Sequence, residues 1–297
     1  MILEGDRDGG EPIRDFVVRR NTFVNYSYGI LVGARDAAEG EYGHLIEYNR
    51  VENCSAGGIM VKCGDTSVRG NTVCNVRRGG VSVVAGKAGE VRDNRIMECE
   101  NGIEVCGDGH TIANNCVVRS RASGIHVRGN MRPEIRAGSN IIVENNTLID
   151  RTGDRVEESP RSGNTDGRAS AGVRVDAGVT CVVQNNLFCG SGRPQSVDLS
   201  NGKRTRCFVR GNAVCGGLSV DGWAVHDVDF ASFDNDDFAN RSGFGAQGWM
   251  VSETTAGPDQ DPAGEILWDE SGEEHEESAE QESPDVRKLI RGVDVVI

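Results

Sequence analysis

The chain has 297 residues, a formal net charge of −14, 40 glycines and only 5% aromatic residues. So acidic a chain lacks the basic surface that binding to phosphate backbones needs, which argues against a nucleic-acid partner. No run of eighteen apolar residues occurs, so no membrane span is expected. The start of the chain shows no basic region followed by an apolar stretch, so no secretory signal is found.

Lysine is scarce, and arginine supplies most of the basic residues. Concentrated salt screens the self-repulsion of such an acidic surface. A halophilic source is one interpretation, and high genomic GC content is the alternative explanation for the arginine bias.

We expect residues 1–12 to form a disordered or truncated N-terminal end. From residue 13 to 220 the motif aliphatic-x-x-Asn-x-aliphatic recurs eight times, with its asparagines at Asn21, Asn49, Asn71, Asn94, Asn115, Asn146, Asn186 and Asn212. A second motif, Gly-aliphatic-x-Val, follows most of them at 29–32, 58–61, 80–83, 102–105, 124–127 and 172–175. Two short strands per repeat, separated by Gly and Asn turns, describe one coil of a solenoid. The repeat is too short for helical solenoids, which need about 33 residues per unit.

We therefore predict an all-β, single-stranded right-handed parallel β-helix over residues 13–220, of the pectate-lyase-like type. An asparagine at the same turn of every coil tolerates a left-handed backbone and can hydrogen-bond to its neighbours above and below, about 4.8 Å away. Eight asparagines in register predict such a ladder.

Five of the ten cysteines recur at fixed coil positions. Three follow a ladder asparagine by three residues, and two follow it by five: Cys74, Cys189 and Cys215, then Cys54 and Cys99. We interpret them as reduced, buried small apolar residues, with a disulfide or a metal cluster as the alternative. No Cys-x-x-Cys pair occurs, which removes the common zinc spacing.

The ends of the repeat are less regular. The first coil begins near Ile13 with no capping element before it, which is consistent with a fragment of a longer β-helix or with pairing at that end. The polar stretch between Asn146 and Gly172 is interpreted as a long loop. Residues 221–264 are expected to form an irregular C-terminal cap, and the acidic residues 265–297 a largely disordered tail.

Alternate residues of the second motif point outward, which gives two columns along the solenoid. The first column contains Met60, Ser82, Glu104, His126 and Arg174. The second column, beside the first, contains Lys62, Val84, Cys106, Arg128 and Asp176. Stacking places Glu104 and His126 about 5 Å apart, close enough for a carboxylate–imidazole pair, and Lys62 roughly 10 Å from Glu104. These columns are either an ordinary polar strand face or a groove for an acidic sugar. For His110, in the turn GDGHTI, a local backbone hydrogen bond is favoured over catalysis.

The stretch from Tyr42 to Val118 resembles the family of polysaccharide lyases that includes chondroitinase B and many alginate lyases. The match rests on HLIEYNRVENC, GGIMVKCGDTSVRGNTV, GGVSVVAGKAGEVRDNRI and GIEVCGDGHTIANN. The resemblance implies β-elimination, in which Ca²⁺ neutralises a uronate carboxylate, a lysine removes the adjacent proton and an arginine assists. Lys62 falls at the position of the catalytic lysine.

The chain departs from this family around the implied calcium site. Residues 55–58 (Ser-Ala-Gly-Gly) stand where the family has its two acidic calcium ligands. Val84 and Ala85 stand where it has an arginine and a histidine. No metal site or other cofactor is therefore predicted, although the resemblance implies Ca²⁺.

Two hypotheses follow. In the first, the chain is a lyase-like enzyme that uses Lys62, Glu104 and His126 in catalysis and binds an acidic polysaccharide or oligosaccharide through Arg128, Arg174 and Asp176. In the second, it is a non-catalytic β-helix, either a carbohydrate-binding or surface structural protein or a truncated relative of the lyases. A copper-delivery β-helix would need a Met/His cluster that we do not find. A monomer is the working expectation, and the substrate class implies an extracellular location.

Overall fold

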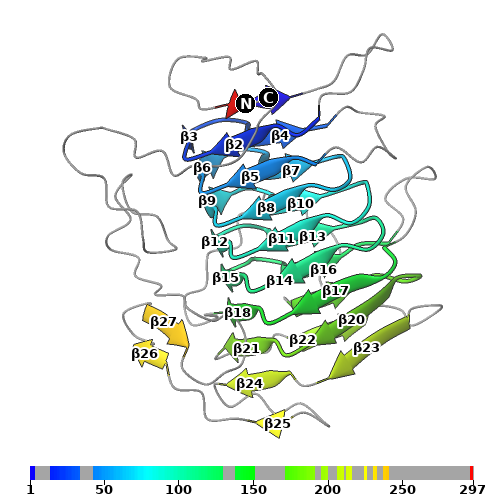
Figure 1. The fold of residues 1–297 in the computed structure, drawn as a ribbon. Helices are drawn as coiled ribbons and strands as arrows, with labels where there is room; N and C mark the ends of the chain where they lie inside the picture. The colour runs from blue at the N-terminus through cyan, green and yellow to red at the C-terminus, as the bar shows by residue number, and fades with distance from the viewer. Residues whose placement is uncertain are drawn as a thin grey trace, which may run out of the picture.

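The computed structural model describes residues 1–3, 14–33, 43–129, 138–150, 171–190, 195–199, 206–210 and 212–215, with short segments at 224–225, 230–232, 237–240 and 295–296. Within these residues the elements are all β-strands. Most strands belong to three sheets in which successive coils add one parallel strand each, so that the chain forms a stack (Figure 1). The predicted parallel β-helix is confirmed.

Each sheet forms one face of the stack, named here A, B and C. Face A contains β1 (Ile2–Leu3), β4 (Tyr28–Val32), β7 (Gly57–Val61), β10 (Gly79–Val83), β13 (Asn101–Val105), β16 (Ser123–Val127), β19 (Ala171–Val175) and β22 (Gln195–Leu199). Face B contains β2 (Val17–Arg19), β5 (Leu45–Glu47), β8 (Ser67–Arg69), β11 (Glu90–Arg92), β14 (Thr111–Ala113), β17 (Ile141–Glu144), β20 (Thr180–Gln184) and β23 (Arg206–Arg210), with β28 (Val295–Val296) at its edge.

Face C contains β3 (Thr22–Val24), β6 (Arg50–Cys54), β9 (Thr72–Val76), β12 (Arg95–Met97), β15 (Cys116–Val118), β18 (Thr147–Asp150), β21 (Leu187–Gly190), β24 (Ala213–Cys215) and β25 (Ala224–Val225). A separate antiparallel pair joins β26 (Phe230–Ser232) to β27 (Asp237–Asn240). The chain runs through faces B, C and A in that order in each coil.

Each coil has three strands, where the sequence pattern suggested two. The asparagine motif, interpreted as one strand, is split by a bend between face B and face C. The left-handed residue of this bend is the one before the ladder asparagine, such as Gly70 (φ 63°), Asp93 (φ 57°) or Asn114 (φ 55°). The predicted role of the ladder asparagine in tolerating a left-handed backbone therefore belongs to its predecessor.

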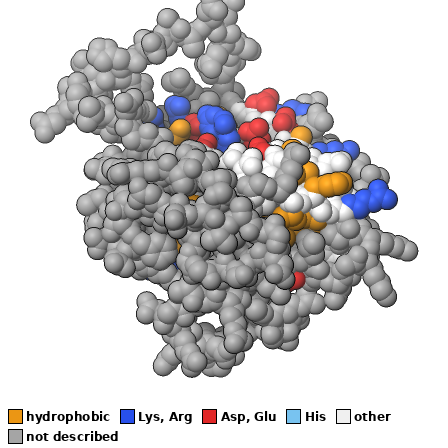
Figure 2. Space-filling view, turned by 90° about the horizontal axis from the view of Figure 1, so that it is seen from below, with side chains coloured by type: hydrophobic (Ala, Val, Ile, Leu, Met, Phe, Trp, Pro, Cys, Tyr) orange, Lys and Arg blue, Asp and Glu red, His pale blue; other side chains and the backbone are white. Residues whose placement is uncertain are grey.

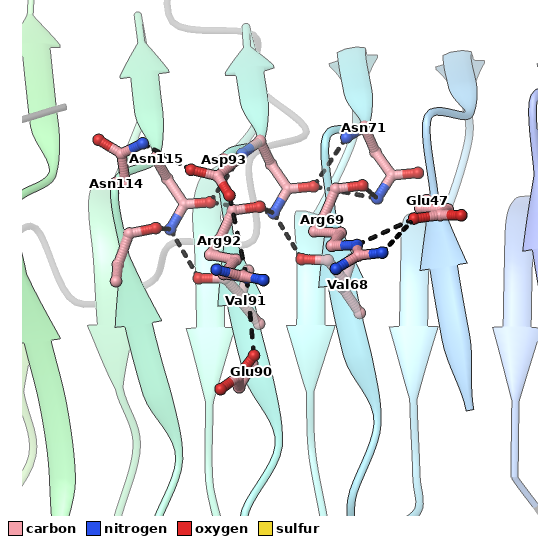
Figure 3. A network of polar contacts seen from close by, with 12 residues as sticks. Glu47, Val68, Arg69, Asn71, Glu90, Val91, Arg92, Asp93, Asn114 and Asn115 are labelled. Atoms are coloured by element: carbon pink, nitrogen blue, oxygen red, sulfur yellow. Dashed lines mark hydrogen bonds and ion pairs between the residues drawn. The ribbon is translucent and has the colours of Figure 1, made fainter. Parts of the chain in front are cut away.

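The asparagine ladder itself is confirmed, with all eight side chains buried. Each Nδ2 donates to the Oδ1 of the next asparagine at 2.9–3.2 Å, which makes seven links along the stack. The same Oδ1 also accepts the backbone N–H of the previous asparagine. Figure 3 shows the stretch of the ladder around Asn71 and Asn115, beside charged side chains of face B such as Arg69 and Arg92. The ladder holds consecutive coils in one register.

The glycine of the second motif lies inside the strands of face A and not in a turn. A Cβ on Gly58 would come within 2.3 Å of the Gly80 carbonyl oxygen, and one on Gly102 within 2.5 Å of the Gly124 oxygen. The same approach recurs at Gly80 and Gly124. These glycines are needed because the next coil's backbone occupies the space of a side chain.

The core is a set of aliphatic columns, such as Ile59, Val81, Ile103 and Ile125 on face A, each fully buried. Cys54 and Cys99 lie in this core as free thiols, as predicted. The prediction is wrong for Cys189, which is disulfide-bonded.

The N-terminal edge of the stack differs from the expectation of an uncapped first coil. Strand β1 (Ile2–Leu3) pairs with β4, and the Met1 ammonium group donates to the Gly29 carbonyl at 2.7 Å. Strand β28 pairs antiparallel with β2. Of the predicted loop between Asn146 and Gly172, residues 151–170 lie outside the described residues, as do nearly all of the predicted cap and acidic tail. Among those described, none forms a helix with the length and hydrophobicity that crossing a membrane requires.

Candidate functional site

A cluster of charged side chains lies on the outer surface of face A, over β13, β16, β19 and β22. The strand register stacks Glu104, His126, Arg174 and Asp198 in this order, one per coil. This extends the predicted first column by Asp198, which the sequence motif missed because its coil lacks the Gly-aliphatic-x-Val pattern.

The second column lies one residue beyond the strand ends. Backbone hydrogen bonds continue the stacking there, from the Arg128 N–H to the Val105 carbonyl (2.8 Å) and from the Asp176 N–H to the Val127 carbonyl (3.0 Å). We call Glu104, His126, Arg128, Arg174, Asp176 and Asp198 the charged cluster.

His126 and Asp176 form the closest acid–base pair of the cluster. The His126 Nε2 lies 3.0 Å from the Asp176 Oδ1, and the other carboxylate oxygen of Asp176 accepts the Gly129 N–H at 3.1 Å. Burial raises the pKa of Asp176, but the hydrogen bond and charge of His126, the Gly129 N–H and the charge of Arg128 lower the pKa by more. The lowered pKa favours the ionised form of Asp176, which holds the imidazole of His126 through Nε2.

Glu104 is held by a second set of contacts. Its carboxylate accepts the Asn101 amide at 2.7 Å and pairs with the Arg128 guanidinium at 3.4 Å. The Ser123 hydroxyl donates to the Asn101 Oδ1 at 2.6 Å. Glu104 and His126 are side by side in register, as predicted, but the carboxylate–imidazole pair that forms is the one between His126 and Asp176.

Asn101 and Ser123 were missed from the sequence. Both precede the motif glycine of their strands and are paired in register. The stacking rule that placed Glu104 beside His126 would have placed them together as well.

Arg174 is the least accessible member of the cluster, because its side chain is only 7% exposed. It pairs with Asp198 at 3.3 Å. The Arg128 side chain is 32% exposed and the Asp176 side chain 34%. Of the residues predicted to bind substrate, Arg128 and Asp176 are thus partly exposed to solvent, whereas the Arg174 side chain is buried beneath the surface.

Lys62 does not join the charged cluster. Lys62 lies in the second column, and its backbone N–H donates to the Val32 carbonyl of the preceding coil. Val84 and Cys106 occupy the two positions of this column between Lys62 and Arg128. Three coils of about 4.8 Å separate the two cations along the stack. The predicted catalytic group of Lys62, Glu104 and His126 is therefore spread over several coils, and Lys62 is not in contact with the other two.

The residues at the implied calcium position do not fit a metal ion. Gly57 and Gly58 are buried in β7, and the approach of the Gly80 carbonyl leaves no room for a side chain at residue 58. Within the described ranges, no group of three or more His, Cys, Asp and Glu side chains is arranged to hold a metal. We derive no catalytic step through calcium.

Two further histidines of the solenoid, His110 and His44, lie outside the charged cluster and make structural contacts. The His110 Nδ1 accepts the Gly89 N–H of the preceding coil at 2.9 Å, so the predicted backbone hydrogen bond is confirmed. Burial lowers the pKa of His110. His44 stacks on Phe16 with ring centroids 3.8 Å apart, and burial lowers its pKa to about 4 against the opposing charge of Asp15.

Charges of both signs mix on the surface. Viewed from the C-terminal end of the stack, Figure 2 shows acidic and basic side chains next to one another along one edge of the described surface.

Comparisons with known proteins agree with this fold. The family model described as right handed beta helix region matches residues 8–249, which confirms the predicted handedness. No curated protein matches the sequence. A solved structure of a mutant of the PL6 family alginate lyase AlyGC is similar with a TM-score of 0.52 and 16% identity, over 80% of this chain and 35% of that one.

A second structure, described as a new PL6 alginate lyase complex with trisaccharide, is 16% identical with a TM-score of 0.43, over 83% of this chain and 65% of that one. The chain thus spans about a third of the first lyase and just under two thirds of the second. At 16% identity the likeness to the first structure shows the fold alone.

Proposed function

Because the chain belongs to the right-handed β-helix family, whose fold it shares with an alginate lyase, we propose that it binds an acidic polysaccharide along the outer surface of face A. We further propose that the charged cluster cleaves this polysaccharide by β-elimination. The observation that carries the proposal is the His126–Asp176 hydrogen bond at 3.0 Å, next to the partly exposed guanidinium of Arg128.

The cluster offers the groups that β-elimination from a uronate needs. Arg128 pairs with the sugar carboxylate and makes the adjacent C–H more acidic. His126 takes that proton through Nδ1, a carbon–carbon double bond forms, and the bond to the glycosidic oxygen breaks as that oxygen takes up a proton from solvent water. The protonated His126 then returns its proton to solvent. Asp176 holds the imidazole in the tautomer that leaves Nδ1 unprotonated. Glu104 positions Arg128 through their 3.4 Å contact.

Lys62 contributes at a different subsite. A polysaccharide that runs along the stack passes every coil in turn, so one chain can contact Arg128 and, three coils away, Lys62. In this proposal Lys62 binds a second uronate, and its loss weakens binding more than it slows the reaction. The family resemblance alone would assign the proton transfer to Lys62, so the two assignments are separable.

A non-catalytic polysaccharide-binding protein is the second candidate. The small residues at 55–58 and Val84 favour it, because a site without calcium must acidify the uronate C–H with arginine alone. Both candidates use the same surface and differ in turnover.

The ultraviolet absorbance of the unsaturated uronate product tests the proposal. The full chain is incubated with alginate and with chondroitin sulfates, at low and high salt. We expect His126→Ala to lower the rate about 100-fold or more, and Lys62→Ala to raise KM with little change in kcat.

The matched control is Arg92→Ala, which removes an exposed arginine from face B. It should leave the rate unchanged, whereas Arg128→Ala should abolish turnover and weaken binding. Binding without product from folded protein would establish the second candidate. A folded protein that neither binds nor cleaves any uronate polymer would overturn both.

A further inference from the structure

Two consecutive coils near the C-terminal end of the stack carry cysteines with the same spacing. The segments CVVQNNLFC and CFVRGNAVC place one cysteine five residues before and one three residues after the ladder asparagines Asn186 and Asn212. The Asn186 Nδ2 donates to the Asn212 Oδ1 at 3.0 Å, so the ladder keeps the two coils in register. The strand pairing accordingly sets Cys181 beside Cys207 on face B and Cys189 beside Cys215 on face C.

The first of these pairs is in sulfur contact. The Cys181 Sγ lies 3.1 Å from the Cys207 Sγ. Cys181 is buried in the core, and Cys207 is half-buried and packs against the core from β23. Directly paired residues on neighbouring parallel strands have the Cα separation that a disulfide accepts. On the opposite side of the same bend, Cys189 is already disulfide-bonded.

We propose that Cys181 and Cys207 form a disulfide between coils, so that the coil of β20 and β21 is cross-linked to the next coil on face B. The two thiols lose two protons and two electrons as the sulfur–sulfur bond forms. The oxidant is a thiol–disulfide exchange partner, such as a low-molecular-weight disulfide, which is reduced to two thiols.

The hydrogen bond between the two thiols determines which cysteine reacts first with the oxidant. The S–H of Cys181 donates to the sulfur of Cys207, which lowers the pKa of Cys207 and raises that of Cys181. The thiolate of Cys207, the more exposed of the two, attacks the disulfide of the oxidant and forms a mixed disulfide. Cys181 then loses its proton and displaces the second thiol of the oxidant.

The position of the pair explains what the bond would do. Strand β23 is the last strand of face B among those described, so it has a strand neighbour on one side only. Phe208, beside Cys207, is 67% exposed. A covalent link would hold this edge strand on the stack. It also implies that the chain matures in an oxidising compartment.

Peptide mapping without reductant tests the proposal. The full chain is produced under oxidising conditions, its free thiols are alkylated, and it is then unfolded and digested. We expect the peptides of Cys181 and Cys207 to be joined, with two hydrogen atoms fewer than the separate peptides. Ten cysteines less two for the bond of Cys189 and two for this one leave six alkylated thiols. Alkylation of both Cys181 and Cys207 in protein whose Cys189 bond is intact would overturn the proposal.

A stability measurement separates the bond from a mere contact. Adding reductant should lower the Tm of the wild type. In the double variant Cys181→Ala/Cys207→Ala this decrease in Tm should be smaller by about 5–10 °C. Cys99→Ala is the matched control, since Cys99 is a buried free thiol in the same core. It should keep the full response to reductant. Equal responses of the double variant and the wild type would contradict a bond between Cys181 and Cys207.

Discussion

Replacing Asn94 by alanine tests whether the ladder stabilises the stack. The Asn94 Nδ2 donates to the Val68 carbonyl (2.8 Å), the Arg92 carbonyl (2.8 Å) and the Asn115 Oδ1 (3.0 Å). Its Oδ1 accepts the backbone N–H of Asn71 at 2.9 Å. Asn71 and Asn94 are fully buried, so water cannot replace the missing amide. The Asn71 N–H and the Val68 carbonyl each lose this hydrogen-bond partner, and each loss costs about 1–3 kcal/mol. The free energy of unfolding should therefore fall by about 2–6 kcal/mol.

Asn75→Gly is the matched control. The Asn75 Nδ2 also donates to an asparagine of the neighbouring coil, the Asn53 Oδ1 at 2.8 Å, but this bond is exposed. Glycine tolerates the left-handed backbone of residue 75 (φ 52°), so the expected loss is below about 1 kcal/mol. Urea unfolding followed by circular dichroism measures both variants, and amide hydrogen exchange at Asn71 should become faster in Asn94→Ala alone. Similar unfolding energies for the two variants would refute a stabilising role for the buried amide column.

Two further predictions concern the coil geometry and pH. Gly58→Ala should destabilise the protein by about 1–3 kcal/mol, seen as a lower urea midpoint, because its Cβ would meet the Gly80 carbonyl at 2.3 Å; an unchanged midpoint would contradict this. The pKa of His44 is lowered to about 4 in the folded chain, so its contribution to stability is complete above about pH 6.5 and is lost as the pH falls toward 4. Unfolding midpoints between pH 7 and 4 should fall less steeply in His44→Phe, which keeps a ring against Phe16, and equally steep profiles would argue against this assignment.

The stacking of the coils could be predicted because its cause is local and repeated. Each ladder asparagine and each motif glycine makes the same contact with the next coil, so their spacing carries the register of the whole stack. The bend between faces B and C could not be predicted in the same way. Its left-handed position holds Gly70 in one coil and Tyr48 or Arg20 in others, so no residue type marks it.

The columns of the site could be predicted, but the side-chain partners could not. Alternation along a strand decides which residue faces outward, and this placed Glu104, His126 and Arg128 correctly. The partner of each depends on rotamers and on atoms one residue past the strand end. Asp176, bound by the Gly129 N–H and His126, is such a case.

Lys62 and the charged cluster predict different positions for the reaction. The motif that resembles the lyases surrounds Lys62. However, Val84, Ala85 and buried glycines occupy the nearby positions where that family has the groups that acidify the substrate. The charged side chains of face A gather three coils further along, where His126, Asp176 and Arg128 are in mutual contact or stacked in neighbouring coils. In a solenoid the same outer surface repeats every coil, so moving a reaction along the axis requires only changes of outward residues and no change in the core. If this chain cleaves its polysaccharide, the cleavage position relative to the bound chain end should therefore follow His126 and not Lys62.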